Sequence, residues 1–91
     1  MSRLSGFTAE ATWNPGSILD GNEEVVEVTV PGARLGDFAF ASFSVDVADL
    51  VLSADVTAAD TVTAILANNT GGAIDLASGT LRVKVVPYEV I

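Results

Sequence analysis

Apolar and polar residues alternate with a period of two along most of the chain. The alternation is clearest over residues 7–13, where Phe7, Ala9, Ala11 and Trp13 fall on one side and threonine or glutamate on the other. The same pattern recurs over residues 23–30, 50–56, 61–67 and 80–86. A period of two is typical of β-strands that bury one face, and no stretch repeats its apolar residues every 3.6 positions over a dozen residues. The pattern therefore predicts an all-β chain with essentially no helix.

Turn-forming residues separate these runs, beginning with Asn14-Pro15-Gly16 and Pro31-Gly32. Short strands spaced by such turns favour a small antiparallel β-sandwich or barrel, jelly-roll-like or Ig-like, of about six to eight strands. No internal repeat or long linker divides the chain. We therefore expect an N-terminal arm over residues 1–6 and a single β domain over residues 7–91.

The segment 58–85 contains the strongest turn signal. Two alternating runs, 61–67 and 80–86, flank a connection that contains Asn68-Asn69-Thr70-Gly71-Gly72 and Ser78-Gly79. These residue types tolerate positive φ or hydrogen-bond to their own backbone in turns. We interpret the segment as one long β-hairpin, with Ile74 and Leu76 partly packed in its connection.

The run FAFASFSVDV over residues 38–47 alternates imperfectly. Phe38 and Phe40 share one face, whereas Phe43, Val45 and Val47 fall on the other. A β-bulge near Ala41 or Ser42 would turn all of them inward; alternatively, both faces of the strand are covered. The sequence does not choose between these two arrangements.

Three shorter segments complete the prediction. Ile18 and Leu19 are expected to tuck under the edge of a sheet. Residues 46–49 form a turn or a single helical turn. Residues 85–91 remain extended, with Pro87 as expected in an edge strand or in an arm that pairs with a neighbour.

Composition narrows the classes of partner. Twelve acidic and four basic residues give a formal net charge of −8, which repels phosphate backbones and anionic lipids, so neither nucleic acid nor a membrane is expected as a partner. The chain has no cysteine to form a stabilising disulfide, yet 49% of its residues are hydrophobic and its mean hydropathy is +0.49. A small domain of this kind is expected to bury apolar surface by forming a homo-oligomer. The first residues lack the apolar core of a signal peptide, which predicts synthesis in a cytoplasm.

Catalytic chemistry is hard to build from these residues. The absence of histidine and cysteine removes the commonest general base and two arrangements of nucleophile. Asp46, Asp49 and Asp55 could supply the carboxylate pair of a glycosidase or ligands for calcium. They lack the alternating spacing of a calcium loop, and a chain of this length offers no obvious cleft. We therefore predict no enzymatic activity, no metal site and no cofactor.

The remaining charged and aromatic residues have simpler interpretations. Asp37, Asp60 and Asp75 stand beside small residues at strand ends, where short carboxylates commonly cap turns. Arg34 and Arg82 are rare cations in an acidic chain, so each is expected to have a carboxylate partner. Lys84 is expected on a solvated face beside Arg82, and Trp13 as a core or interface anchor in preference to a platform for sugars.

Three long stretches carry a resemblance to a known group of proteins. They are ATWNPGSI (11–18), VTVPGARLGDFAFASFS (28–44) and VTAADTVTAILANNTGGAIDLASGTLRVKV (56–85). Together they resemble small virion proteins of tailed bacteriophages and prophages, a group that includes capsid decoration (cement) proteins and folded parts of fibres. The chain carries no fibrous repeat or collagen-like stalk, which favours a compact decoration protein.

The resemblance implies a non-enzymatic head decoration protein that binds the major capsid protein on the outer surface of the virion and stabilises the shell. It also implies a homo-oligomer, a trimer in preference to a dimer. The arm 2–7 or the segment 87–91 is expected to contact the capsid or a neighbouring subunit. The alternative is a tail or head fibre module that binds host glycans through Trp13 or Tyr88. The residues expected at interfaces are Leu4, Phe7, Trp13, Arg34, Phe40, Phe43, Tyr88, Val90 and Ile91.

Overall fold

The computed structural model describes residues 6–90, and for Val90 the backbone alone. Eight β-strands and one short 3-10 turn follow each other along the chain. They are β1 (Phe7–Trp13), β2 (Gly16–Ile18), β3 (Glu23–Thr29), β4 (Phe38–Phe43), β5 (Val51–Ala58), β6 (Thr61–Ala67), β7 (Ile74–Leu76), β8 (Gly79–Val86) and η2 (Tyr88–Val90).

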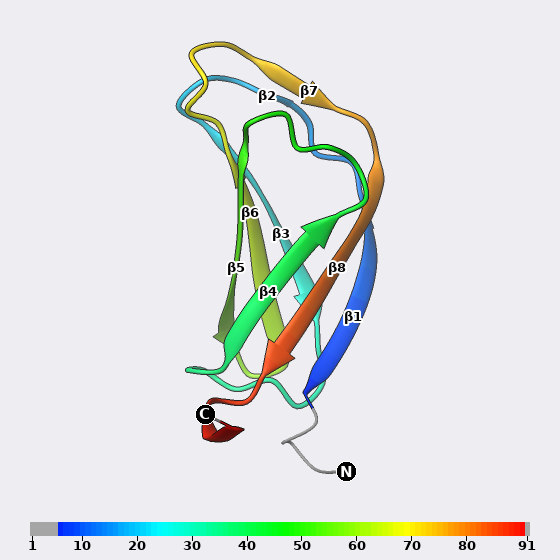
Figure 1. Ribbon diagram of the computed structural model, residues 1–91, viewed down its shortest axis with the longest axis vertical. Coiled ribbons are helices and arrows are strands. Elements are labelled where there is room, and N and C mark those ends of the chain that lie inside the picture. Colours follow the sequence, from blue (N-terminus) through cyan, green and yellow to red (C-terminus); the bar gives the residue numbers. More distant parts are fainter. Residues whose placement is uncertain (1–5, 91) are drawn as a thin grey trace.

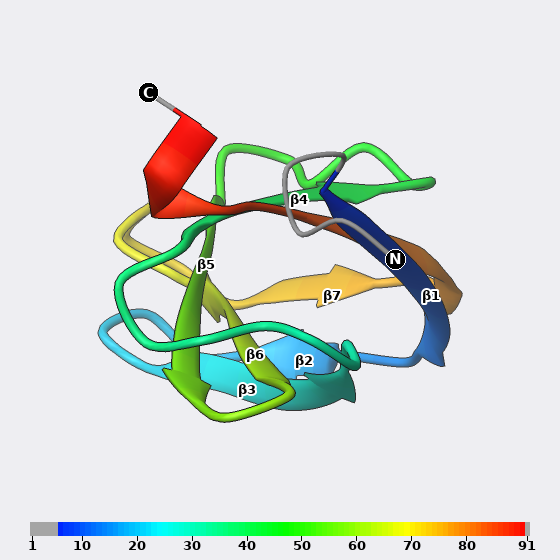
Figure 2. The ribbon, with the colours of Figure 1, turned by 90° about the horizontal axis from the view of Figure 1, so that it is seen from below.

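The strands form two facing layers. One three-stranded sheet has the order β1-β8-β4 and the other the order β3-β6-β5, and all pairs are antiparallel. The view along the long axis in Figure 2 shows these sheets as the two layers of a sandwich. The short strands β2 and β7 pair with each other and close one end, whereas the C-terminal turn lies at the opposite end (Figure 1). The predicted all-β sandwich is confirmed.

The core lies between the inner faces of the two sheets. In β8, Leu81, Val83 and Val85 are buried, and they face the buried residues Val62, Ala64 and Leu66 of β6. Both strands are the central strands of their sheets, so alternate residues of each point into the interior. The alternation predicted for residues 61–67 and 80–86 is therefore confirmed for each strand.

The predicted hairpin between these two runs is wrong. β6 pairs with β3 and β5, whereas β8 pairs with β1 and β4, so the two strands lie in opposite layers. Each strand has an apolar face of its own to bury, and facing the other across the core buries both faces, which edge-to-edge pairing would not do. The connection between them crosses from one sheet to the other and includes β7, where Leu76 is buried and Ile74 packs against the core.

The hairpin that does form joins β5 to β6 through Ala59 and Asp60. Asp60 adopts a positive φ of 61°, and its Oδ1 accepts a hydrogen bond of 2.8 Å from the backbone N–H of Gly32. Its backbone C=O accepts another, of 2.7 Å, from the N–H of Val30. Asp60 thus caps turns as predicted, and it also joins the β5–β6 hairpin to the end of β3.

Neither arrangement expected for residues 38–47 is present within the chain. β4 pairs with β8 in an unbroken register from Phe38↔Val86 to Phe43↔Leu81, so it contains no bulge. Ala39, Ala41 and Phe43 pack against the core, whereas Phe38 and Phe40 point away from it and are 42% and 58% exposed. The following residues form a tight turn, as expected, in which Ala48 and Asp49 have positive φ and the Asp46 carboxylate accepts from the N–H of Ala48.

A buried asparagine holds the closed end of the sandwich together. The Asn68 Nδ2 group donates to the carbonyls of Ile18 (2.7 Å) and Gly72 (2.8 Å), and its Oδ1 accepts from the backbone N–H and the hydroxyl of Thr70. Ile18 is only 2% exposed, whereas its neighbour Leu19 is 59% exposed. The expectation for residues 18–19 is thus confirmed for Ile18 and wrong for Leu19.

The C-terminal segment is not extended to its end, as the sequence suggested. Strand β8 ends at Val86, Pro87 is fully buried, and residues Tyr88–Val90 form the 3-10 turn η2. Buried Asp37 bridges this segment to the loop before β4: its Oδ2 accepts from the N–H of Arg34 (2.9 Å), and its Oδ1 accepts from the N–H of Tyr88 (3.2 Å). Asp37 therefore caps a turn as predicted and also fixes the start of η2.

Candidate functional site

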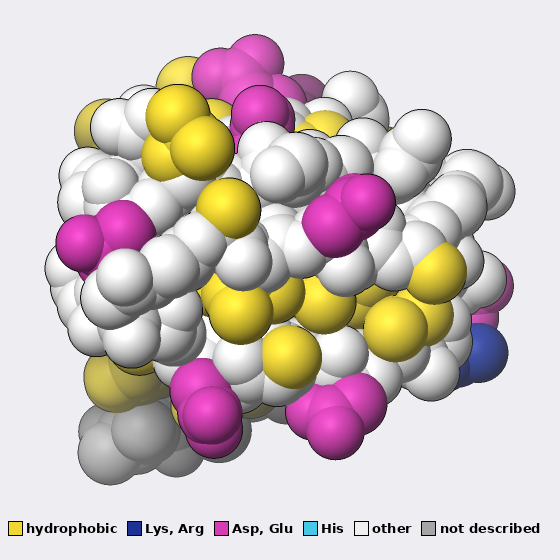
Figure 3. All heavy atoms as spheres, turned by 90° about the horizontal axis from the view of Figure 1, so that it is seen from above, with side chains coloured by type: hydrophobic (Ala, Val, Ile, Leu, Met, Phe, Trp, Pro, Cys, Tyr) yellow, Lys and Arg dark blue, Asp and Glu magenta, His cyan; other side chains and the backbone are white. Residues whose placement is uncertain are grey.

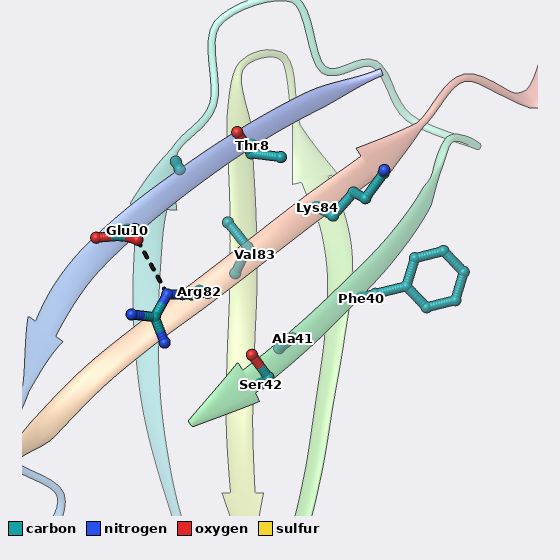
Figure 4. A pocket seen from close by; sticks show the side chains of 9 residues that line it. Thr8, Glu10, Phe40, Ala41, Ser42, Arg82, Val83 and Lys84 are labelled. Carbon is teal, nitrogen blue, oxygen red and sulfur yellow. Dashed lines mark hydrogen bonds and ion pairs between the residues drawn. The ribbon is translucent and has the colours of Figure 1, made fainter. Parts of the chain in front are cut away.

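The outer face of the β1-β8-β4 sheet gathers most of the chemically distinctive side chains. Two cross-strand rows run over it, Thr8–Lys84–Phe40 and Glu10–Arg82–Ser42, each contributed by β1, β8 and β4 in turn. These six side chains line a shallow groove of ≈ 410 Å³ (Figure 4). The residues of β8 form the floor of the groove, and the side chains of β1 and β4 form its sides. Its chemistry is mixed, with an aromatic ring, hydroxyls and charges of both signs.

Arg34 and Arg82 each have a carboxylate partner, as the sequence predicted. The Nε of Arg82 donates a 3.0 Å hydrogen bond to Oε1 of Glu10 across the groove. An Nη of Arg34 lies 3.9 Å from Oε2 of Glu89. Both pairs are solvent-exposed, so each contributes little to stability. Lys84 lies exposed on the same face as Arg82, as expected, so two of the four basic residues of the chain are on this face.

Exposed apolar side chains cluster at and beside the start of β4. Phe38 and Phe40 project from the strand, Leu35 (64% exposed) precedes it, and Tyr88 (50% exposed) follows from η2. The backbone N–H of Tyr88 donates a hydrogen bond to the carboxylate of Asp37, which holds η2 beside the loop that carries Leu35. We call Leu35, Phe38, Phe40 and Tyr88 the exposed apolar band. Large apolar side chains exposed close together in the chain and fold commonly mark a protein–protein contact.

The outer face of the other sheet has the opposite electrostatic character. Glu23 and Glu27 of β3 and Asp55 of β5 surround a small apolar area that includes Val25 and Val51. Acidic side chains are also spread around the closed end of the sandwich, where a basic side chain is visible only at the margin (Figure 3). The negative charge of the molecule is thus distributed over most of its surface, whereas the outer face of the β1-β8-β4 sheet is electrostatically mixed.

The predicted interface residues divide into a buried and an exposed set. Trp13 and Phe43 form an edge-to-face pair with ring centroids 5.7 Å apart and belong to the packed interior. Phe7 is half-buried and lies over Gly32, where an added Cβ would come within 2.9 Å of its ring. Phe40, Arg34 and Tyr88 are exposed. The residues Leu4 and Ile91 and the side chain of Val90 lie outside the described part of the chain.

Trp13 cannot act as the sugar platform of the fibre alternative, because its ring is buried beneath the sheet and packed against Phe43. The aspartates considered for calcium have separate positions: Asp46 and Asp49 belong to the turn after β4, and Asp55 lies on β5. Within residues 6–90, no three acidic side chains come together in a group that could hold a metal ion.

The expected capsid-binding segments are more firmly attached than the sequence suggested. Phe7 belongs to β1, Pro87 is buried and Tyr88 donates to Asp37, so these residues belong to the folded domain. The remainder of the N-terminal arm, residues 2–5, lies outside the described residues. Leu35 and Phe38 were not among the individual residues predicted at interfaces, although the strand 38–43 was expected to supply core and interface. If the alternation is read through β4 without a break, Phe38 and Phe40 fall together on the outer face of the sheet.

No protein-family model matches the chain, and a search of curated proteins also gives no match. Among residues 6–90, no helix is long and apolar enough to cross a membrane.

Proposed function

We propose that this protein is a non-enzymatic head decoration protein of a tailed bacteriophage, which binds the major capsid protein and stabilises the outer shell. The proposal originates in the sequence resemblance described above. The observation that supports it most directly is the exposed apolar band, because an isolated subunit gains nothing from exposing two phenylalanines, a leucine and a tyrosine together. A subunit that is buried against a shell would cover such a band.

The end of the molecule that carries η2 is the surface we assign to the shell. The loop before β4, which carries exposed Leu35, and η2, which carries exposed Tyr88, lie at this end, as does the start of β1 (Figure 1). Asp37 holds the two segments that carry these side chains in place, so the surface is preorganised and loses little conformational entropy on binding. Binding to one form of the shell would stabilise that form by mass action.

Purified particles of the phage that encodes the chain provide the first test. We expect its copy number, measured by quantitative mass spectrometry, to equal that of the major capsid protein or to be a simple fraction of it. A few copies per particle would contradict a decoration role and support the fibre alternative, in which exposed Tyr88, and not buried Trp13, would contact the glycan. Absence from the particles would contradict both.

A pair of variants tests the assigned surface. Leu35→Ser combined with Tyr88→Ser is expected to reduce occupancy on shells to a small fraction of the wild-type value, because it removes two exposed apolar contacts without disturbing the core. Leu19→Ser is the matched control, since Leu19 is equally exposed but lies at the closed end of the sandwich. Equal occupancy of the two variants would contradict the assignment of this end to the shell.

A further inference from the structure

Among the four edges of the two three-stranded sheets, the edge of β4 alone carries no charge. Strands β1 and β4 are the edges of one three-stranded sheet, and β3 and β5 are the edges of the other. β1 carries Glu10, β3 carries three glutamates, and β5 carries Asp55 and a register shift between Val56 and Ala58. Charged residues and bulges of this kind prevent edge strands from pairing with other chains. β4, with the sequence FAFASF, has neither a charge nor a proline nor a bulge.

We infer that β4 pairs antiparallel with β4 of a second copy of this chain, so that two β1-β8-β4 sheets join into one six-stranded sheet across a two-fold axis. Among the described residues, β4 pairs with β8 alone; β5 of the other sheet lies close to it without pairing, so the second edge of β4 has no strand partner (Figure 1). The inference deepens the proposed function, on which its biological setting rests, because it assigns the self-association to one strand. It favours a two-fold contact over the trimer expected from the resemblance.

The alternation of β4 restricts the register of this pair. Directly opposite residues of an antiparallel pair point to the same face. The two-fold axis must therefore lie level with one residue of β4, which then faces its own copy in the second chain. An axis at Phe40 opposes 38 to 42 and 39 to 41, and keeps five of the six residues of β4 in the pair. It also sets the two Phe40 rings directly opposite each other, with each Phe38 ring on their diagonal. The exposed rings of both copies then form one continuous apolar row.

The distribution of charge favours the edge of β4 over the acidic edges of β1, β3 and β5 as the contact for a second copy. Two chains with a formal net charge of −8 repel each other wherever their acidic edges meet. Beside β4 the nearest charged residues on the outer face are Lys84 and Arg82. Across the joined sheet the two Lys84 positions are three strand spacings apart, about 14 Å, which exceeds the Debye length at physiological salt. The contact is therefore free of strong repulsion.

The isolated chain provides the test, in buffer without any virus particle, so that its result is independent of the test for shell binding. In analytical ultracentrifugation we expect the mass to rise from 9.3 kDa towards twice that value with increasing concentration. Phe40→Glu and Phe40→Lys are each expected to abolish the dimer by opposing like charges at the axis, and an equimolar mixture of the two variants to restore it. Val25→Glu, on the exposed face of β3, is the control and leaves the dimer intact.

Cysteine cross-linking tests the register, because the wild-type chain has no cysteine. Residues directly opposite in an antiparallel pair have Cα atoms about 4.5 or 5.5 Å apart, which a disulfide can bridge. Phe40→Cys is therefore expected to oxidise to a covalent dimer, whereas Val25→Cys, at a position 47% exposed on β3, remains monomeric. A wild-type chain that stays monomeric at every concentration, or equal cross-linking of the two variants, would overturn the inference.

Discussion

At the scale of single residues, the fold depends on a few short polar side chains that connect segments far apart in the sequence. Asn68 contacts the backbone of Ile18, fifty residues earlier, and Asp37 contacts the backbone of Tyr88, fifty-one residues later. Each is buried, and each uses both of its terminal side-chain atoms in hydrogen bonds. A buried polar group that is fully paired specifies one arrangement of the backbone, because any alternative leaves donors or acceptors unsatisfied.

Replacement of Asn68 by alanine tests this role. Asn68→Ala removes the side-chain partner of the Ile18 carbonyl and of the Thr70 amide and one of the two donors to the Gly72 carbonyl, so we expect the free energy of unfolding to fall by about 3 kcal/mol. Urea denaturation followed by tryptophan fluorescence measures the loss, since Trp13 is buried. The exposed neighbour provides the control: Asn69→Ala is expected to change stability by no more than about 0.5 kcal/mol. Equal losses in the two variants would contradict the role of the Asn68 side chain.

The local part of this chemistry could be predicted from sequence, whereas the distant part could not. Asp37 and Asp60 were expected to cap turns because short carboxylates bond to nearby backbone amides, and Asp37 does so with Arg34. The distant partners, Tyr88 for Asp37 and Gly32 for Asp60, depend on how the sheets pack. Of the predicted interface residues, Trp13 and Phe43 proved to belong to the core, because an aromatic residue in an alternating run fits either face of a sheet equally well by type.

At the scale of strands, the alternating pattern predicted existence and orientation better than pairing. The five runs with clear alternation are all strands, and their apolar faces are the inner faces. The partner of each strand was not encoded in its own pattern: residues 61–67 and 80–86 have similar faces, and their proximity in sequence favoured a hairpin. In the structure, the connection over residues 68–78 instead crosses from one sheet to the other, and its residue Leu76 is buried in the core.

The short strand β2 offers a test of how the closed end is anchored. Ile18 is buried while Leu19 is exposed, although the two residues are adjacent and nearly equal in size. Ile18→Ala is expected to lower the free energy of unfolding by about 3 kcal/mol through loss of buried apolar area and formation of a cavity. Leu19→Ala is expected to stay within about 0.5 kcal/mol of the wild type. Urea denaturation compares the two variants, and the reverse ranking would show that the closed end packs differently.

At the scale of the whole molecule, charge and edge protection are connected. Three of the twelve acidic residues lie on β3, at Glu23, Glu24 and Glu27, along one exposed edge. Glu27 and Asp55 also flank Thr63 from the two neighbouring strands of β6. Such clustering of like charges destabilises the compact state through repulsion, and salt screens it. The same glutamates keep the β3 edge from pairing with another chain.

Neutralising the glutamates of β3 is therefore expected to change both the stability of the chain and its self-association. At low ionic strength, a variant with Glu23→Gln, Glu24→Gln and Glu27→Gln should have a free energy of unfolding that is higher by roughly 0.5 kcal/mol. This free energy should also depend less on salt than that of the wild type. It should also self-associate more strongly in analytical ultracentrifugation, because β3 becomes a second uncharged edge. The matched control replaces Asp46, Asp49 and Asp75 with asparagine, which changes the net charge equally but leaves every edge of the three-stranded sheets intact.

The comparison separates edge protection from net charge. If both variants gain stability at low salt and only the β3 variant self-associates, the glutamates act as a barrier at that edge, and β4 is the one edge of the described three-stranded sheets that has no such barrier. If both variants self-associate equally, overall repulsion alone keeps the chains apart, and the position of a charge along a strand does not matter. The two outcomes differ because repulsion over the whole surface depends on the sum of the charges, whereas strand pairing depends on the few side chains beside the exposed backbone.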